Sequence, residues 1–254
     1  MEKRNRLRHG DVAIVLICVA LALVTVGAVG TAGRMRAREV VCLSNVCQLS
    51  QAWLLYAEGH NGRLVGGGAA DYPMQWVGRP VLRGTVEQKL DAIRRGLLFP
   101  YVGDVRVYRC SADGRQRDPN VFGLRSFSIA GGANGDSWTG YANARVYSDL
   151  ANPAERYIFV EEANPRGASS SSWQMNPKAG QWVDPVGMWH DNKSSLGFAD
   201  GHAETHPWHD RSFIDWSLKA VETPYLFMFG MTPPEDERQD IEYMAMRFPY
   251  KALK

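Results

Sequence analysis

Residues 12–33 contain no charged side chain. As an α-helix, these 22 residues extend for about 33 Å, enough to cross the roughly 30 Å hydrocarbon core of a bilayer. So long an uncharged run so near the start of a chain predicts a membrane-spanning helix, and it favours a molecule that is fixed to lipid.

Basic residues on either side of this segment set the expected orientation. Four of them precede it: Lys3, Arg4, Arg6 and Arg8. Because such residues favour the cytoplasm, we expect residues 1–11 to form a cytoplasmic basic leader. Residues 12–33 then span the inner (cytoplasmic) membrane once, and the C-terminal part is periplasmic or extracellular. Arginines at positions 34, 36 and 38 follow the segment and reduce the difference in positive charge between the two sides of the membrane. The alternative is a cleaved secretory signal, with the small residues 28–30 as its cleavage site.

The helix is expected to continue beyond the membrane. Residues 34–58 contain neither proline nor glycine. Apolar residues recur among them at helical spacing and predict an amphipathic continuation over residues 34–60: Leu43, Val46, Cys47, Leu54 and Ala57. The turn-forming sequence GHNG at residues 59–62 predicts where this helix ends.

Residues 61–254 predict an exported, β-rich globular domain. β-branched and aromatic runs predict strands at residues 105–109 and 156–160, and a hairpin of residues 194–199 and 202–206 around the Asp200-Gly201 turn. Helices are expected at residues 85–98 and 235–247, and an exposed loop at residues 167–180. The predicted class is α+β: a long N-terminal helix, a mainly antiparallel β domain and a short C-terminal helix.

The net charge limits the kinds of partner that the sequence predicts. A net charge of only +2, without a concentrated basic face, argues against nucleic acid as a partner. Because residues 12–33 are predicted to span a membrane, membrane lipid is the first expected partner.

The cysteines allow two interpretations. In an oxidising compartment, either Cys42 or Cys47 is a candidate to form a disulfide with Cys110; the alternative is that all three are small buried side chains. No CxxC or zinc-type Cys/His spacing is present, so the sequence predicts no structural zinc site.

Two regions resemble a bacterial family. Residues 36–62, RAREVVCLSNVCQLSQAWLLYAEGHNG, are similar to the start of prepilin-like proteins of the type II secretion pseudopilin class. In residues 189–202, WHDNKSSLGFADGH, nine residues separate His190 from Asp200-Gly201, which resembles the H-x9-DG signature of prepilin-type processing-associated proteins. Residues 107–113, VYRCSAD, are similar to the family's Cys-Pro-x-Asp segment, with serine in place of proline.

The resemblance implies a pilin-like fold and a function in assembly. Its members are membrane-anchored structural or interaction subunits of type II secretion or type IV pilus-like assemblies. The implied partners are other pilin-like subunits or the secretion machinery, and no enzymatic activity is implied. In this chain, the residues that carry the signature are His190, Asp200 and Gly201.

One part of the chain departs from the family pattern. Such proteins usually begin with Gly-Phe-Thr-Leu-Ile-Glu, which a prepilin peptidase cuts after glycine. The nearest equivalent here is GDVAIV at residues 10–15, which would be cut between Gly10 and Asp11. Val15 then occupies the position of the glutamate that helps subunits register in a filament. We therefore expect Gly10 to remain uncut and the protein to remain a single-pass anchor.

A metal-binding protein is the chemical alternative. Because residues on a strand alternate between its faces, His202, Glu204 and His206 would share one face and offer two imidazoles and a carboxylate. A transition metal held there could support metal-dependent activity. The simpler interpretation is that Asp200-Gly201 forms a turn and that His190 hydrogen-bonds across the hairpin.

Two further ligands were weighed against these residues. Calcium is a candidate at Asp191, Asn192 and Asp200, which offer hard oxygen ligands, although no EF-hand spacing is present. An exported glycan-binding surface is a candidate at three tryptophans that could stack on sugars: Trp173, Trp182 and Trp189. Nucleophilic catalysis has little support, because the chain has no Gly-x-Ser-x-Gly elbow.

Overall fold

The computed structural model describes residues 9–71, 73–81, 84–117, 125–136, 141–165, 169–223 and 226–251. Within the first helix, the side chains of residues 9–13, 15, 22, 23 and 25–29 are outside the described part. The expected basic leader falls largely on residues 1–8, which are also outside it.

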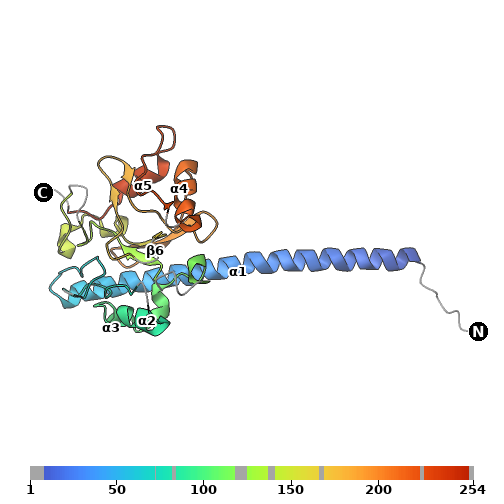
Figure 1. Cartoon of the computed structure of the whole chain (residues 1–254), viewed down its shortest axis with the longest axis horizontal. Helices are drawn as coiled ribbons and strands as arrows, with labels where there is room; N and C mark the ends of the chain where they lie inside the picture. Colours follow the sequence, from blue (N-terminus) through green and yellow to red (C-terminus); the bar gives the residue numbers. More distant parts are fainter. Residues whose placement is uncertain are drawn as a thin grey trace, which may run out of the picture.

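Helix α1 (His9–Gly59) runs without a break along the length of the molecule (Figure 1). It ends where expected: Asn61 and Gly62 adopt φ angles of 56° and 78°, and the Gly62 N–H bonds to the carbonyl of Ala57 at 2.8 Å. Within the described residues, α1 is long and apolar enough to cross a membrane. Its first half projects from the globular part, and its second half is packed against it.

The packed half of α1 buries one stripe of side chains. These follow steps of three and four residues: Cys42, Val46, Leu49, Trp53 and Ala57. The expected stripe was partly wrong, because Leu43, Cys47 and Leu54 are only half-buried at its margin. The stripe turns toward the sheet about one residue earlier, and this places Cys42 rather than Cys47 in the core.

The central sheet has four antiparallel strands in the order β1-β2-β5-β6. They are β1 (Phe127–Ile129), β2 (Tyr157–Glu161), β5 (Lys193–Phe198) and β6 (Ala203–Pro207). Strands β5 and β6 form the expected hairpin, with Ser195 paired to Thr205. At its turn, Gly201 adopts a φ angle of 94°, and the Phe198 N–H bonds to the carbonyl of His202 at 2.9 Å.

Helices cover both faces of this sheet (Figure 1). The second half of α1 covers one face, and α4 (Arg211–Glu222) and α5 (Gln239–Met246) lie beyond the other. Side chains of β2 divide between the two resulting cores: Ile158 and Phe159 pack toward α1, whereas Tyr157 and Val160 belong to the core under α4 and α5. A small second sheet pairs β3 (Met175–Asn176) with β4 (Gln181–Trp182).

The domain contains the expected β structure, but one of the expected strands does not form. Residues 105–109 do not form a strand, because η1 (Val105–Tyr108) is a 3₁₀ turn in which the Asp104 side chain accepts the Arg106 N–H. Helix α4 was not expected at all. Helices α2 (Val86–Arg94) and α5 are shorter than expected, and α2 is followed by the short helix α3 (Phe99–Val102). The remaining 3₁₀ turns are η2 (Gly114–Arg117), η3 (Tyr147–Asp149) and η4 (Pro153–Glu155).

The expected exposed loop at residues 167–180 is only partly correct for the part that the structure describes: Ser170, Lys178 and Ala179 are exposed, but the middle of the segment is buried. Ser169, Ser172 and Gln174 are buried, and Trp173 is fully enclosed. The Ser172 N–H and hydroxyl both bond to Asp136, and the Gln174 N–H bonds to Asp184. Serines can enter the interior here because their polar atoms find partners.

Candidate functional site

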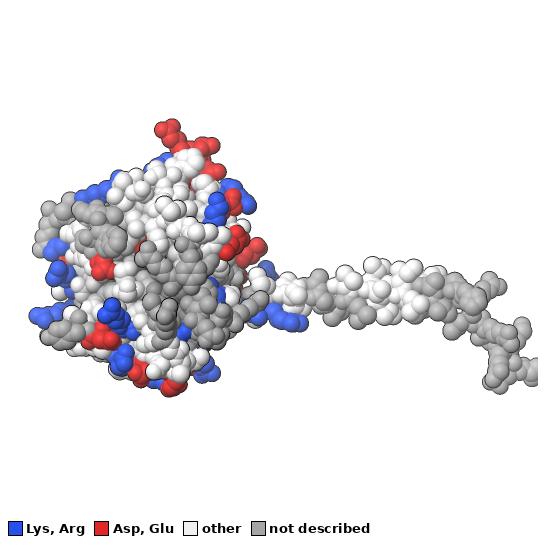
Figure 2. Space-filling model, viewed as in Figure 1, with Lys and Arg blue, Asp and Glu red and all other residues white. Residues whose placement is uncertain are grey.

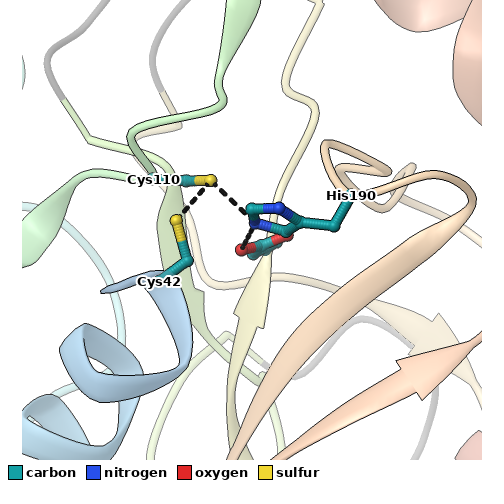
Figure 3. A group of neighbouring side chains, drawn as sticks. Cys42, Cys110 and His190 are labelled. Atoms are coloured by element: carbon teal, nitrogen blue, oxygen red, sulfur yellow. Dashed lines mark hydrogen bonds and ion pairs between the residues drawn. The ribbon is translucent and has the colours of Figure 1, made fainter. Parts of the chain in front are cut away.

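Four ionisable side chains meet in the interior of the domain. Cys42, Cys110, Glu161 and His190 are each buried, and their sulfur, oxygen and nitrogen atoms all lie within 4.8 Å of one another. Figure 3 shows Cys42 on helix α1, with Cys110 and His190 reaching toward the same point from two separate coil segments. Among the described residues, no other group of three or more His, Cys, Asp or Glu side chains converges in this way.

Cys42 and Glu161 are held by regular structure. Cys42 opens the buried stripe of α1, so the packing of that helix fixes its direction. Glu161 is the last residue of β2, where it pairs with Phe127 of β1. Its carboxylate is fully buried at the end of an otherwise apolar strand.

Cys110 and His190 are held by coil segments that are anchored on both sides. Cys110 follows η1, and beyond it the buried Asp113 and Arg115 form an ion pair of 2.7 Å. Arg115 also donates to the carbonyl of Asn164, which ties the segment to the exit of β2. His190 lies just before β5, in a turn where Asp191 and Asn192 both adopt φ angles of 56°.

The distances within the cluster are short. The two sulfurs lie 2.7 Å apart, His190 Nε2 is 3.2 Å from Cys110 Sγ, and the same nitrogen is 3.6 Å from Glu161 Oε1 (Figure 3). Backbone N–H groups point at both sulfurs: Ser111 N–H donates to Cys42 Sγ at 3.3 Å, and Ala112 N–H donates to Cys110 Sγ at 3.4 Å. The sulfurs therefore serve as hydrogen-bond acceptors.

Burial and mutual contact change the acidities of these groups. The hydrogen bond with Cys110 lowers the pKa of Cys42 to about 5, whereas burial raises the pKa of Cys110 well above its ordinary value. Burial raises the pKa of Glu161 to about 7. Burial alone would lower the pKa of His190, but its contacts with Cys42 and Glu161 outweigh that effect and raise the pKa to about 9. The cluster therefore favours one thiolate beside an imidazolium.

The structure answers which cysteine lies near Cys110. Cys42 does, whereas Cys47 points along the helix toward the hairpin turn, with its sulfur 3.5 Å from the carbonyl oxygen of Gly201. Cys18 is exposed on the projecting half of α1. The adjacency of Cys42 and Cys110 is compatible with the expected disulfide, although the thiols also face two other ionisable groups.

The H-x9-DG segment contacts α1 at both of its ends. His190 does not hydrogen-bond across the hairpin, as the simpler interpretation expected; it points away from the turn, toward Cys110 and Glu161. At the other end, a Cβ atom on Gly201 would lie 3.4 Å from the side chain of Gln51. Asp200 caps the turn by accepting the His202 N–H.

The three residues of the alternative facial triad do not converge in this structure. His202 contacts Asp200 and Glu204 at the surface, with its Nε2 3.3 Å from Glu204 Oε1. His206 instead packs inward, stacked on Tyr243 with ring centroids 3.9 Å apart. The three residues form no converging group within the described chain, because the aromatic contact draws His206 toward α5.

The expected calcium and glycan sites are not assembled either. Asp191 and Asn192 precede β5, whereas Asp200 follows it, so about 20 Å of strand separates them. Trp173 and Trp182 are fully buried, and Trp182 stacks on Phe213 with centroids 3.8 Å apart. Neither can offer a face to a sugar. Trp189 is half-buried under Arg115.

Two expected site residues remain to be placed. Gly10 and Asp11 lie in the first turns of α1, but the side chain of Asp11 is outside the described residues. Glu161 was missed as a member of the cluster. Its only signal in the sequence is a carboxylate that closes the apolar run YIFV, where burial is expected. Comparisons with family models, curated proteins and solved structures gave no match to this chain.

Proposed function

We propose that this protein is a membrane-anchored, pseudopilin-like structural or interaction subunit. The observation that carries the proposal is the division of α1 into two halves of different surroundings. One half is uncovered and aliphatic, and the other is integral to the core of the domain. Such a helix fixes a folded domain to lipid and offers its uncovered half to the helices of neighbouring subunits.

The uncovered half is strongly apolar on its described positions. Six aliphatic side chains between 50% and 68% exposed lie along it: Ile14, Leu16, Ile17, Val19, Leu21 and Val24. At roughly 25 cal/mol per Å² of apolar surface, leaving such a surface in water is unfavourable. No described segment of the globular part covers it (Figure 1), so lipid or other apolar helices are its natural surroundings.

A basic junction separates this half from the domain. Arg34, Arg36 and Arg38 are exposed on α1 before its first buried residue, Cys42. Figure 2 shows basic side chains where the rod meets the globular part. Arginines at this position suit the level of anionic lipid headgroups. From Gly33 to Cys42, nine residues of helix would hold the domain about 14 Å beyond the apolar segment.

The sequence resemblance supports the same proposal. The segment before and around Cys42 is similar to the start of pseudopilins, and residues 190–201 resemble the H-x9-DG signature. In this structure the two similar regions contact each other, since the H-x9-DG segment lies on the packed half of α1. A resemblance in two segments that pack together is a stronger support than either segment alone.

Cys18 offers a native test of helix association. It is an exposed thiol on the uncovered half of α1. In native membranes, mild oxidation of the full chain is expected to link copies, or to link this chain to another subunit, through Cys18. The matched variants are Cys18→Ser, which should abolish the linked product, and Cys47→Ser, which should retain it.

Membrane fractionation tests the anchor separately. The full chain should stay with membranes after an alkaline wash, whereas a chain lacking residues 1–33 should be released. Recovery of the full-length, uncleaved chain in the aqueous fraction would refute the anchor. If the chain is anchored but Cys18 gives no linked product in any membrane preparation, the subunit role fails and an isolated anchored domain remains.

A further inference from the structure

The buried cluster has the composition and convergence of a metal site. Two sulfurs, one imidazole nitrogen and one carboxylate oxygen face a common point from four separate segments of the chain. Zinc is bound in proteins by these ligand types, most often four at a time in tetrahedral geometry. All four residues are at most 2% exposed, which is typical of a closed structural site.

Buried polar atoms of the cluster that lack hydrogen-bond partners also support a metal site. Neither carboxylate oxygen of Glu161 accepts a hydrogen bond of normal geometry, although both are buried. A buried carboxylate is costly unless hydrogen bonds or a cation compensate it, and His190 Nε2 lies 3.6 Å from Glu161 Oε1, beyond hydrogen-bond distance. His190 Nε2 faces Cys110 Sγ and Glu161 Oε1 together, yet one ring nitrogen has a single proton to donate. As a ligand, the same nitrogen would direct its lone pair at an ion between them.

The hydrogen bonds to the sulfurs distinguish thiolate ligands from a simple cystine. The Ser111 and Ala112 N–H groups approach Cys42 Sγ and Cys110 Sγ at 3.3 and 3.4 Å. Negatively charged sulfur is the better acceptor for such donors, and hydrogen bonds of this kind orient metal ligands and tune the metal. Two backbone donors on two adjacent sulfurs therefore suit a pair of thiolates.

We propose that Cys42, Cys110, Glu161 and His190 bind a zinc-type divalent cation that fastens helix α1 to the sheet. The ion needs two thiolates and a neutral imidazole, so the Cys110 thiol proton and the His190 imidazolium proton leave to solvent when the ligands coordinate it. Because four protein ligands fill a tetrahedral site, the ion is structural. The site is independent of the proposed role in assembly.

The geometry needs a small adjustment to hold the ion. With zinc–sulfur bonds of about 2.3 Å, two sulfurs in a tetrahedral site lie about 3.8 Å apart, so the present 2.7 Å must widen by about 1 Å. The nitrogen–sulfur distance of 3.2 Å and the nitrogen–oxygen distance of 3.6 Å are within about 0.4 Å of tetrahedral edges. Ser111, whose N–H contacts Cys42 Sγ, lines an open groove between α1 and η1.

The test measures metal binding by the full chain in detergent. After purification under reducing, chelator-free conditions, the protein is expected to retain about one zinc ion per chain. Replacement by Co²⁺ should give the sulfur-to-metal charge-transfer absorption and the intense visible bands of a tetrahedral thiolate site. Cys110→Ser should lose both signals. Cys47→Ser, which lies on α1 like Cys42 but outside the cluster, should keep them.

A conservative pair of variants guards against misfolding. Glu161→Gln should weaken zinc binding by more than the ~10–100-fold that loss of an outer-sphere partner costs. Glu162→Gln, a neighbouring buried carboxyl that bonds to Ser128 and Asn164 instead, should bind like the wild type. Far-UV circular dichroism checks that each variant is folded. If Cys110→Ser is unfolded, the glutamate pair decides.

Three results would overturn the proposal. One is that the reduced wild-type protein binds neither zinc nor cobalt. Another is bound metal that persists in folded Cys110→Ser, which would place it elsewhere. The third is a Cys42–Cys110 disulfide, seen as a loss of two hydrogens in a mapped peptide, in a protein that still takes up no metal after reduction.

Discussion

Gly197 of β5 lies so close to Ser50 of α1 that a Cβ atom at Gly197 would come within 2.2 Å of Ser50 Oγ. The same added atom would meet the side chain of Val46 at 2.9 Å and its carbonyl oxygen at 3.2 Å. Because Gly197 has no side chain, the β5 backbone packs directly against Ser50 and Val46 of α1. The contact lies midway along the H-x9-DG segment, so a residue with no role in the signature itself permits the segment to pack on the helix.

Replacing this glycine should loosen the contact between helix and sheet. Gly197→Ala forces either Ser50 or the β5 backbone to move, and overpacking of this kind costs typically ~1–3 kcal/mol. Gly114→Ala is the matched control, because a Cβ atom there meets nothing within 4 Å. Thermal unfolding followed by tryptophan fluorescence should show a lower midpoint for the first variant alone. Equal midpoints would show that the close approach is relieved without cost.

The buried ion pair after Cys110 should matter far more than an exposed one. Asp113 and Arg115 side chains are 1% and 5% exposed, and Asp113 also accepts the Ser126 hydroxyl at 2.7 Å. Asp113→Ala leaves a buried guanidinium uncompensated and is expected to reduce the free energy of unfolding by about 3–5 kcal/mol.

The control for this pair is Asp215→Ala. Its partner Arg211 is 71% exposed, and such surface pairs contribute about 0–1 kcal/mol. Chemical denaturation of both variants measures the difference. Similar losses in the two would mean that the Cys110 segment does not depend on its ion pair.

His206 should make the domain sensitive to mild acid. Burial lowers its pKa from 6.5 to about 4 in the folded state. Electrostatic repulsion from His209 and Arg247 contributes to this lowering of the pKa, and the Asp240 carboxylate lies 4.0 Å away, beyond hydrogen-bond distance. Between these two pH values, the unfolded chain binds more protons than the folded one. The free energy of unfolding therefore falls as the pH decreases through this window, by up to about 3 kcal/mol.

The variant His206→Phe isolates this effect. A phenyl ring keeps the stack on Tyr243 but has no proton to bind, so the stability difference between pH 6.5 and pH 4 should shrink relative to the wild type. His60→Gln, at an exposed position, should retain the wild-type difference. Stability measured against pH for the three proteins checks this, and identical curves for wild type and His206→Phe would contradict it.

The uncut N-terminus is a further expectation. Val15 stands where pseudopilin-like chains carry the acid at the fifth mature position, so we expect the membrane-extracted protein to retain residues 1–10. Intact-mass measurement decides the point. A product that begins at Asp11 would show that a prepilin peptidase accepts this chain, and a product that begins beyond residue 28 would indicate a cleaved secretory signal.

Local chemistry made some elements predictable from the sequence. The long helix follows from an apolar run and the absence of proline, and GHNG ends it. The β5–β6 hairpin follows from Asp200-Gly201, because that pair forms a tight turn wherever two strands flank it. In both cases, the residues that decide the structure are neighbours along the chain.

Tertiary contacts decided the elements that the sequence misled. The β-branched Val105 and Val107 suggested a strand, but capping by Asp104 and packing against α1 fold this segment into a 3₁₀ turn. Alternation placed His206 beside His202 on one face, yet Tyr243 of α5 stacks on it. Trp173 and Trp182 were candidates for a sugar-binding surface, but they fill the core.

The sequence predicted only part of the buried cluster, the pairing of its two cysteines. Pairing Cys110 with a cysteine of the helix was expected, and the phase of the buried stripe selects Cys42. Glu161 and His190 could not be joined to them, since Cys42 and Cys110 are 68 positions apart and Cys110 and His190 are 80 apart. No short spacing records such a site; it exists only once α1, β2 and the two coil segments have packed.

Helix α1 has a mechanical consequence for the molecule. Its 51 residues form a stiff lever of about 76 Å, one arm of which is built into the interior of the head. Because α1 is one unbroken helix, a tilt or roll of its projecting half turns the globular domain through the same angle. Under the proposed anchoring, the orientation of the projecting half in the membrane therefore fixes which side of the globular domain faces a neighbouring subunit.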